Sequence, residues 1–194
     1  MERNGWKLAG ILLTVSLLFE TRVLWAGNNL LTNPGFEKCT LEEVNNQKVF
    51  GWSINTWAAP GTAELVTDEE KTHSGSQCIL FHPKTPGQEA HIFQMVPVKS
   101  DRKYLFKVWA RADKKVIDKL TYPPRIKLVV YQYKDGQFLG SVGSNYLSPV
   151  TEKWKEFTYE YTPAKEEINN VGCAIAVVDC PVYIDDASFT LTEE

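Results

Sequence analysis

Short runs in which hydrophobic and polar residues alternate recur along most of the chain. The run KYLFKVWARA at residues 103–112 is typical, because Tyr104, Phe106 and Val108 occupy every second position. Successive side chains of a strand point to opposite faces, so these three residues form a core face and Trp109 lies on the other face. A large aromatic side chain exposed to water needs a reason, and Trp109 is therefore a candidate functional residue.

Ten such runs predict ten short strands, since they are rich in β-branched and aromatic residues and are separated by Gly, Pro and Asp. Asp135 and Gly136 stand between two of them and indicate a tight hairpin. Residues 113–120 form either one or two helical turns or a mobile loop. The spacing predicts one all-β domain, an antiparallel jelly-roll β-sandwich. The expected strands are residues 51–57, 63–67, 76–82, 90–98, 103–112, 125–133, 138–142, 154–162, 171–178 and 182–191.

The first 27 residues have the layout of a secretory signal peptide. Arg3 and Lys7 precede a largely apolar run at residues 8–19, and the small residues Ala26 and Gly27 follow. This run is too short to span a bilayer, although an uncleaved amphipathic anchor is an alternative. We therefore expect residues 1–27 to be removed and residues 28–194 to form one domain of a protein that is secreted, either extracellular or periplasmic.

Charge and cysteine content narrow the function classes. The chain has 21 basic and 24 acidic residues, and the first 27 residues take away three basic and two acidic ones, which leaves a net charge of −4. So mild an acidic excess gives no reason to expect nucleic acid, or a membrane after signal cleavage, as a partner. The four cysteines favour disulfides over free thiols in an exported chain, and their spacing with the histidines fits no zinc site.

Motifs of nucleophilic or zinc-dependent hydrolases are absent from the sequence, which contains neither GxSxG nor HExxH. The pair Asp185 and Asp186 is notable because it lies inside an apolar strand, where an unpaired carboxylate is costly. One of the two carboxylates must face inward or meet a cation. Either calcium, which prefers hard oxygen ligands, or backbone N–H groups that donate hydrogen bonds would satisfy it.

Several motifs together resemble the carbohydrate-binding modules of families 4, 9, 16 and 22, which bind xylan and glucans. They are NLLTNPGFE at residues 29–37, GW at 51–52, HSGSQCILF at 73–81, FQMVPV at 93–98 and the closing VYIDDASFTL at 182–191, together with KYLFKVWARA and WKEFTYEYT. The resemblance covers essentially the whole domain. It implies a galactose-binding-like jelly roll that binds a glycan chain in a groove across one concave sheet.

The resemblance also assigns residues by position. It implies structural calcium held by Glu37 with Asp185 or Asp186, completed by backbone oxygens near Ser74 and Gly75. It implies disulfides between Cys78 and Cys180 and between Cys39 and Cys173. The carbohydrate-binding residues that it implies are Trp57, Gln94, Lys107, Trp109, Arg111, Tyr131 and Tyr133.

The parity of the strand at residues 125–133 supports the last set independently. Tyr131 and Tyr133 share one face with Lys127, opposite Ile126 and Leu128. A pyranose ring stacks its C–H face on an aromatic plane and offers hydroxyls to polar side chains, which aromatic and polar residues together supply. The alternative is that covered aromatics form a second small core.

We therefore expect a non-catalytic protein that binds a polysaccharide of the xylan or β-glucan class and acts alone or with a separate glycoside hydrolase. Two alternatives stay open. The chain could be a small jelly-roll glycoside hydrolase or lyase whose acids converge only in the folded protein. It could also be a cell-envelope or adhesion module whose aromatic face binds a protein partner.

Overall fold

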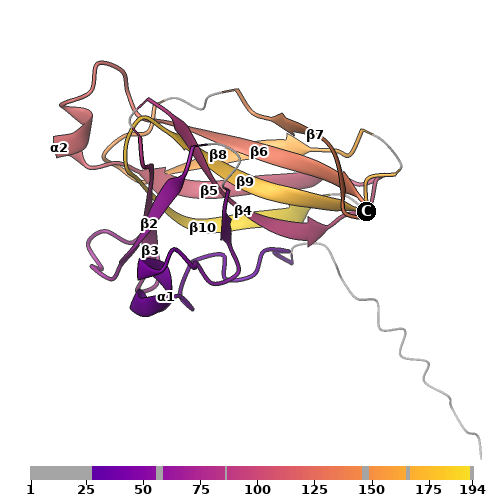
Figure 1. Ribbon diagram of the computed structural model, residues 1–194, viewed down its shortest axis with the longest axis horizontal. Coiled ribbons are helices and arrows are strands. Elements are labelled where there is room, and N and C mark those ends of the chain that lie inside the picture. The colour runs from indigo at the N-terminus through magenta and orange to yellow at the C-terminus, as the bar shows by residue number, and fades with distance from the viewer. Residues whose placement is uncertain (1–27, 56–58, 86, 146–148, 165–166, 193–194) are drawn as a thin grey trace, which may run out of the picture.

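The computed structural model describes residues 28–55, 59–85, 87–145, 149–164 and 167–192, and it is a β-sandwich of two antiparallel sheets. Figure 1 shows the two layers, with the short helix α2 at one end of the sandwich. The strands are β1 (Ser53–Ile54), β2 (Gly61–Val66), β3 (Cys78–Pro83), β4 (Glu89–Pro97), β5 (Tyr104–Arg111), β6 (Arg125–Lys134), β7 (Gln137–Gly143), β8 (Lys155–Tyr161), β9 (Asn170–Val178) and β10 (Val182–Leu191); the helices are α1 (Leu41–Asn45) and α2 (Lys114–Ile117).

Each sheet has five strands within the described residues. The β9 sheet has the order β1-β4-β9-β6-β7, and the β10 sheet has the order β2-β3-β10-β5-β8. We name each sheet after its central strand. This architecture confirms the predicted all-β jelly-roll class, and each of the ten predicted strands overlaps an observed one.

The helices are short. Helix α2 lies inside residues 113–120, where helical turns were one of two expectations. Helix α1 was not predicted, although the sequence carries its signal. The Thr40 side chain accepts a hydrogen bond from the Glu43 N–H, and the Glu43 carboxylate accepts one from the Thr40 N–H in return, which is a capping box.

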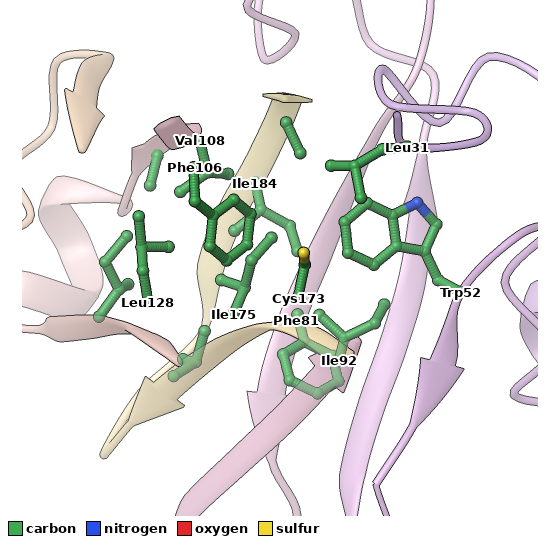
Figure 2. Close-up of a cluster of buried hydrophobic side chains, with 14 of the residues drawn as sticks. Leu31, Trp52, Phe81, Ile92, Phe106, Val108, Leu128, Cys173, Ile175 and Ile184 are labelled. Atoms are coloured by element: carbon green, nitrogen blue, oxygen red, sulfur yellow. The ribbon is translucent and has the colours of Figure 1, made fainter. Parts of the chain in front are cut away.

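The core between the sheets is built by the inward positions of the alternating strands. Phe106 from β5 and Ile184 from β10 meet Leu128 from β6 and Ile175 from β9, and all four side chains are fully buried (Figure 2). Trp52 closes one side of this core, and its indole N–H donates to the Asn33 carbonyl at 3.2 Å. The parity derived for the strand at residues 103–112 is thus confirmed for its inward face.

The hairpin predicted at Asp135 and Gly136 joins β6 to β7. Both residues have positive φ, 47° and 82°, which a two-residue turn of type I′ requires and which glycine and aspartate tolerate. The Asn169 side chain donates to the Asp135 carboxylate at 2.8 Å and holds the turn against the start of β9.

All four cysteines are buried free thiols, so the expectation of two disulfides is wrong. Strands β3 and β10 pair Phe81 with Val182, which places Cys180 beside the end of β3 near Pro83. Cys78 lies five residues away along that strand, about 16 Å at the usual rise per residue. A disulfide requires the two Cα atoms to be within about 7 Å, so Cys78 and Cys180 cannot pair.

Cys39 and Cys173 are also separate. Cys39 lies in the segment before α1, where the Asn33 amide donates to its sulfur at 3.4 Å. Cys173 lies on β9 inside the main core (Figure 2), and burial raises the pKa of its thiol well above the ordinary value. The even number of cysteines predicted bridges that the fold does not form.

Within the described residues, no helix combines the length and the apolar character needed to cross a membrane. The proposed signal peptide, residues 1–27, lies outside the described residues.

Candidate functional site

The predicted carbohydrate-binding residues divide between the two sheets. Lys107, Trp109 and Arg111 lie on β5 in the β10 sheet, whereas Tyr131 and Tyr133 lie on β6 in the β9 sheet. Each set occupies the outer face of its own sheet, and the two outer faces look away from each other. The expectation that they share one groove is therefore wrong. Alternation along a strand tells which residues share a face, but not to which of two sheets the strand belongs.

A further residue of the predicted groove, Gln94, lies elsewhere. Gln94 follows the inward parity of β4, and its amide is used within the protein. Its Oε1 accepts from the Thr32 N–H, and its Nε2 donates to the carbonyls of Thr32 at 2.9 Å and Gly51 at 2.6 Å. Gln94 thus fastens the N-terminal segment to the β9 sheet and does not lie on its outer face. Trp57 lies outside the described residues.

On the outer face of the β10 sheet, Trp109 is covered by a loop. The ring of His73 stacks on Trp109 with a centroid distance of 4.0 Å and an interplanar angle of 16°. The same His73 ring meets Trp154 edge-on at a centroid distance of 5.5 Å. The Nδ1 atom of His73 lies 2.6 Å from the Asp186 carboxylate. The indole that the sequence left exposed is therefore packed against the protein itself.

The cations beside Trp109 are also bound internally. The Arg111 guanidinium lies 5.0 Å from the centroid of Tyr183 and 3.4 Å from the Asp113 carboxylate. The Tyr183 hydroxyl donates to the same carboxylate at 2.9 Å, and burial together with Asp113 raises the pKa of Tyr183 to about 12. Lys107 pairs with Glu156 at 3.2 Å on the neighbouring strand β8. We call Trp109, His73, Trp154, Arg111 and Tyr183 the Trp109 cluster.

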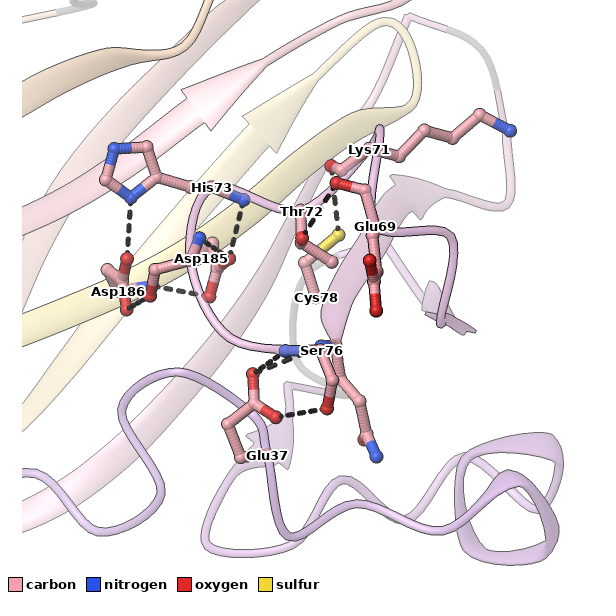
Figure 3. A network of polar contacts seen from close by, with 11 residues as sticks. Glu37, Glu69, Lys71, Thr72, His73, Ser76, Cys78, Asp185 and Asp186 are labelled. Carbon is pink, nitrogen blue, oxygen red and sulfur yellow. Dashed lines mark hydrogen bonds and ion pairs between the residues drawn. The ribbon is translucent and has the colours of Figure 1, made fainter.

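Next to this cluster, three carboxylates hold the loop at residues 73–77 (Figure 3). Asp185 is fully buried and accepts from the backbone N–H groups of His73 at 3.0 Å, Ser74 at 3.3 Å and Asp186 at 2.8 Å. Burial, and to a smaller extent the charge of Asp186, raises the pKa of Asp185 to about 6. Hydrogen bonds from the backbone, one of the two expected solutions for this carboxylate, are thus present.

Glu37 binds the other half of the loop. Its carboxylate accepts from the N–H and the hydroxyl of Ser76 at 3.0 and 2.7 Å and from the Gln77 N–H at 3.1 Å. Gly75 has φ +63°, and a Cβ atom there would lie 2.2 Å from a Glu37 oxygen. Only glycine fits at this position, since the carboxylate and a side chain would occupy the same space.

The predicted calcium ligands are therefore brought to one loop, but each already has protein partners. Every carboxylate oxygen of Glu37, Asp185 and Asp186 accepts an N–H or O–H donor or contacts the His73 ring. Across the part of the chain that the structure describes, no three His, Cys, Asp or Glu side chains are arranged to hold a metal ion. Calcium at this loop stays a prediction.

The outer face of the β9 sheet gathers a second set of aromatic residues, which we call the aromatic face. Its members are Phe93 on β4, Tyr131 and Tyr133 on β6, and Phe138 on β7. Between β4 and β6, the middle of the central strand β9 carries small residues on this side, Gly172, Ala174 and Ala176. Ala174 pairs with Phe93 and with Val129, and Gly172 pairs with Met95 and with Tyr131.

The rings of the aromatic face pack on one another across the sheet. Tyr131 meets Phe93 edge-on at 6.0 Å, and Phe138 lies 6.3 Å from Tyr131 and 5.6 Å from Tyr133. Each tyrosine is only 8% exposed, whereas Phe138 is 51% exposed. A Cβ atom on Gly172 would lie 3.1 Å from the Tyr131 ring, so this ring leans over β9. The tyrosines thus form a small second core with Val129, Ala174 and Ala176, and the exposed ring of Phe138 packs against both tyrosines.

A chain of polar groups borders these rings. The Tyr131 hydroxyl accepts from the Asn55 amide at 3.3 Å and forms a short hydrogen bond with Nδ1 of His91. The other ring nitrogen of His91 lies 2.6 Å from the Glu89 carboxylate. Burial raises the pKa of Tyr131, so its hydroxyl stays protonated at neutral pH. The aromatic face therefore offers one exposed ring, Phe138, above buried tyrosines and beside a polar edge.

The sequence pattern could have found some of these residues. His91, Phe93 and Met95 alternate with the apolar residues of β4, so the same parity argument that selected Tyr131 places Phe93 on an outer face. Phe138 follows the predicted hairpin. The face of the sheet on which its side chain lies can be assigned only when its register with Tyr133 is known.

Comparison with known proteins agrees with this architecture. A family model described as a carbohydrate binding domain, of the CBM 4 and 9 type, matches residues 28–179. No curated protein matched the sequence. Among solved structures, the CBM22-1 xylan-binding domain of Paenibacillus barcinonensis Xyn10C is similar, with a TM-score of 0.58 and 15% identity over 87% of this chain and 97% of that one.

Two other structures are similar in fold. TmCBM61 in complex with β-1,4-galactotriose has a TM-score of 0.52 and 20% identity, and the match covers 84% of this chain and 99% of the module. Tailspike protein 4 of bacteriophage CBA120, its enzymatically active domain, has a TM-score of 0.61 and 12% identity over 84% of this chain. The chain spans only 21% of that phage structure.

The family match covers most of the described domain, and the similar structures share its two-sheet fold. Such low identities to solved structures show the fold alone, whereas the family model also assigns the family. The chain belongs to the carbohydrate binding domain family of the CBM 4 and 9 type.

Proposed function

We propose that this protein is a secreted, non-catalytic module that binds a polysaccharide of the xylan or β-glucan class on its aromatic face. One observation carries the choice of face. The outer face of the β9 sheet has an aromatic ring that is half exposed, Phe138, beside a polar edge, whereas the Trp109 cluster on the other sheet is bound internally.

The chemistry of a sugar ring fits such a face. The C–H side of a pyranose stacks on an aromatic plane, and Phe138 provides one that is accessible. The hydroxyls need polar partners, and the partly exposed carboxylate of Glu89 lies at the edge of the face, beside the buried side chains of Asn55 and His91. Because a shallow, hydrated surface leaves little surplus after ordering a flexible chain, we expect affinities on the order of micromolar to millimolar.

Similar proteins support the ligand class. The Paenibacillus module is named a xylan-binding domain, and TmCBM61 was solved with a β-1,4-linked galactose trisaccharide. Support for secretion comes from the signal-like segment before residue 28. A separate glycoside hydrolase is the partner that such a module would serve.

A binding panel with matched variants tests the proposal. Affinity electrophoresis and calorimetry against xylan, β-glucans, galactan and mannan should find at least one ligand, and Phe138→Ala should weaken its binding about tenfold because the stacking plane is lost. The control is Phe50→Ala. Phe50 is 45% exposed, close to the value for Phe138, but lies in the turn between Val49 and Trp52. This variant should bind like the unchanged protein.

The panel also separates the alternatives. Absence of binding to every glycan, together with concentration-dependent association with a protein, would replace glycan binding by an adhesion role. Release of reducing sugar from a polysaccharide would establish a hydrolase or lyase. Repeating the panel with a chelator tests the predicted calcium, whose removal should lower thermal stability and leave the aromatic face unchanged.

A further inference from the structure

A cavity of about 470 Å³ opens at the end of the sandwich away from α2, where β5 begins and β10 ends. It lies on neither the aromatic face nor the Trp109 cluster. Its apolar wall is formed by Leu30, Val98, Tyr104 and Leu191, and Lys99 and Arg102 also line it. The volume falls within the range of about 300–1,000 Å³ that is usual for sites of small ligands.

The wall of this cavity is held in place by hydrogen bonds. The Tyr104 hydroxyl accepts from the Lys99 N–H at 2.7 Å, and the Val98 N–H donates to the Asn169 carbonyl at 3.0 Å. On the opposite side, the Leu30 N–H donates to the Phe189 carbonyl at 2.9 Å. The cavity is thus pre-formed, so a ligand would not have to order the wall on binding.

The two cations at the cavity have little internal compensation. Lys99 is exposed, and its ammonium has no ion pair within the described residues. The Arg102 side chain is about one-third exposed, and its Nε lies 3.7 Å from the carboxylate of Asp101, whose side chain is mostly exposed. This contrasts with Lys107 and Arg111 on the β10 sheet, which are paired with carboxylates.

We propose that this cavity binds a single-chain anionic amphiphile, with its aliphatic chain against Leu30, Val98 and Leu191 and its carboxylate near Lys99 and Arg102. Charge complementarity selects an anion. The aliphatic wall selects a hydrocarbon chain over a sugar, because among the described residues the only side-chain polar group on that wall is the Tyr104 hydroxyl, which is already bonded to the Lys99 backbone. This proposal is independent of glycan binding on the aromatic face.

Calorimetry with sodium dodecanoate below its micelle concentration tests the proposal on the full chain. We expect one saturable site. The double variant Lys99→Gln/Arg102→Gln should weaken binding by at least about tenfold, since charge-assisted hydrogen bonds to the carboxylate are lost. Because both side chains are at the surface, the variant should fold. The control Lys84→Gln/Lys153→Gln, which removes two exposed cations elsewhere, should bind dodecanoate normally.

Two comparisons locate the site and its charge. Decyltrimethylammonium, a cationic amphiphile, should not bind, and Phe138→Ala should leave dodecanoate binding unchanged. Absence of saturable binding, equal binding of the cationic probe, or loss of dodecanoate binding in Phe138→Ala would each overturn the proposal. Glycan binding should be the same in Lys99→Gln/Arg102→Gln, so the failure of one proposal is distinguishable from the failure of the other.

Discussion

The two outer faces of the sandwich carry similar residues but differ in how those residues are bound. On the β10 sheet, Trp109 is stacked on His73 and the nearby Arg111 is paired with Asp113. On the β9 sheet, Tyr131 is bonded to His91, but Phe138 remains half exposed. The first face uses its aromatic and charged groups to hold a loop, and the second leaves an aromatic plane for a ligand.

This difference shows that residue types alone do not identify a binding surface. A tryptophan between two cations matches the composition of a sugar site, yet in this protein each of these groups has an internal partner. A polar or aromatic group is available to a ligand only when the protein has not already used it. Each of the following measurements tests this division between the faces, beginning with the largest expected effect.

Trp109→Ala should lower the free energy of unfolding by about 3 kcal/mol, because it removes a large side chain that His73 covers. Glycan affinity should not change, since the aromatic face is on the other sheet. Denaturant unfolding and the glycan panel measure the two quantities on one sample. Loss of affinity without loss of stability would instead place the binding site on the β10 sheet.

The pH dependence of stability should report the buried Asp185. Its pKa is raised to about 6 in the folded protein, so the folded state binds this proton more tightly than the unfolded chain does. The contribution of Asp185 to the free energy of unfolding should therefore be greatest below about pH 4. It should fall by about 1–3 kcal/mol as the pH rises through 6. The difference between the unchanged protein and Asp185→Asn, followed by denaturation from pH 4 to 7 with chelator present, isolates this contribution.

Calcium would alter that curve in a defined way. A bound divalent cation stabilises the ionised carboxylate, so adding calcium should flatten the pH dependence if the predicted site exists. An identical curve with calcium and with chelator would contradict calcium binding at the loop of residues 73–77.

Tyr131→Phe should lower stability by about 1 kcal/mol. The ring remains, but Asn55 and His91 each lose the hydroxyl as a hydrogen-bond partner. Thermal unfolding measures this loss, and Tyr133→Phe is the matched control because Tyr133 lies beside Tyr131 on the same face. An equal loss in both variants would show that the polar chain around His91 does not support the aromatic face.

Lys107→Ala should have the smallest effect, below about 0.5 kcal/mol, because its ion pair with Glu156 is about one-third exposed and screened by water. Glycan affinity should be unchanged. A clear reduction in affinity would return Lys107 to the set of binding residues that the sequence predicted.

Much of the fold could be predicted from local patterns. The inward residues Phe106 and Val108, the hairpin at Asp135 and Gly136, and the strand at residues 182–191 follow from period-two alternation and turn chemistry. These features depend on neighbours in the sequence. They therefore needed no knowledge of how the strands are ordered.

The site depended on information that local patterns lack. Trp109 and Tyr131 were each assigned correctly to an outward position, but the chain crosses from one sheet to the other between β5 and β6. The family resemblance implies a groove position for Gln94, yet Gln94 follows the inward parity of β4 and bonds Thr32. Strand order and long-range hydrogen bonds decide such cases, and both arise only in the folded chain.

The position of β10 has a consequence for the order of folding. This strand lies between β3 and β5, so the β2-β3 and β5-β8 pairs of its sheet are joined only through residues 182–191. During synthesis the other strands of that sheet emerge first and present unpaired edges until β10 is available. The sandwich therefore closes late, and removal of this single strand should leave two separate strand pairs prone to aggregation.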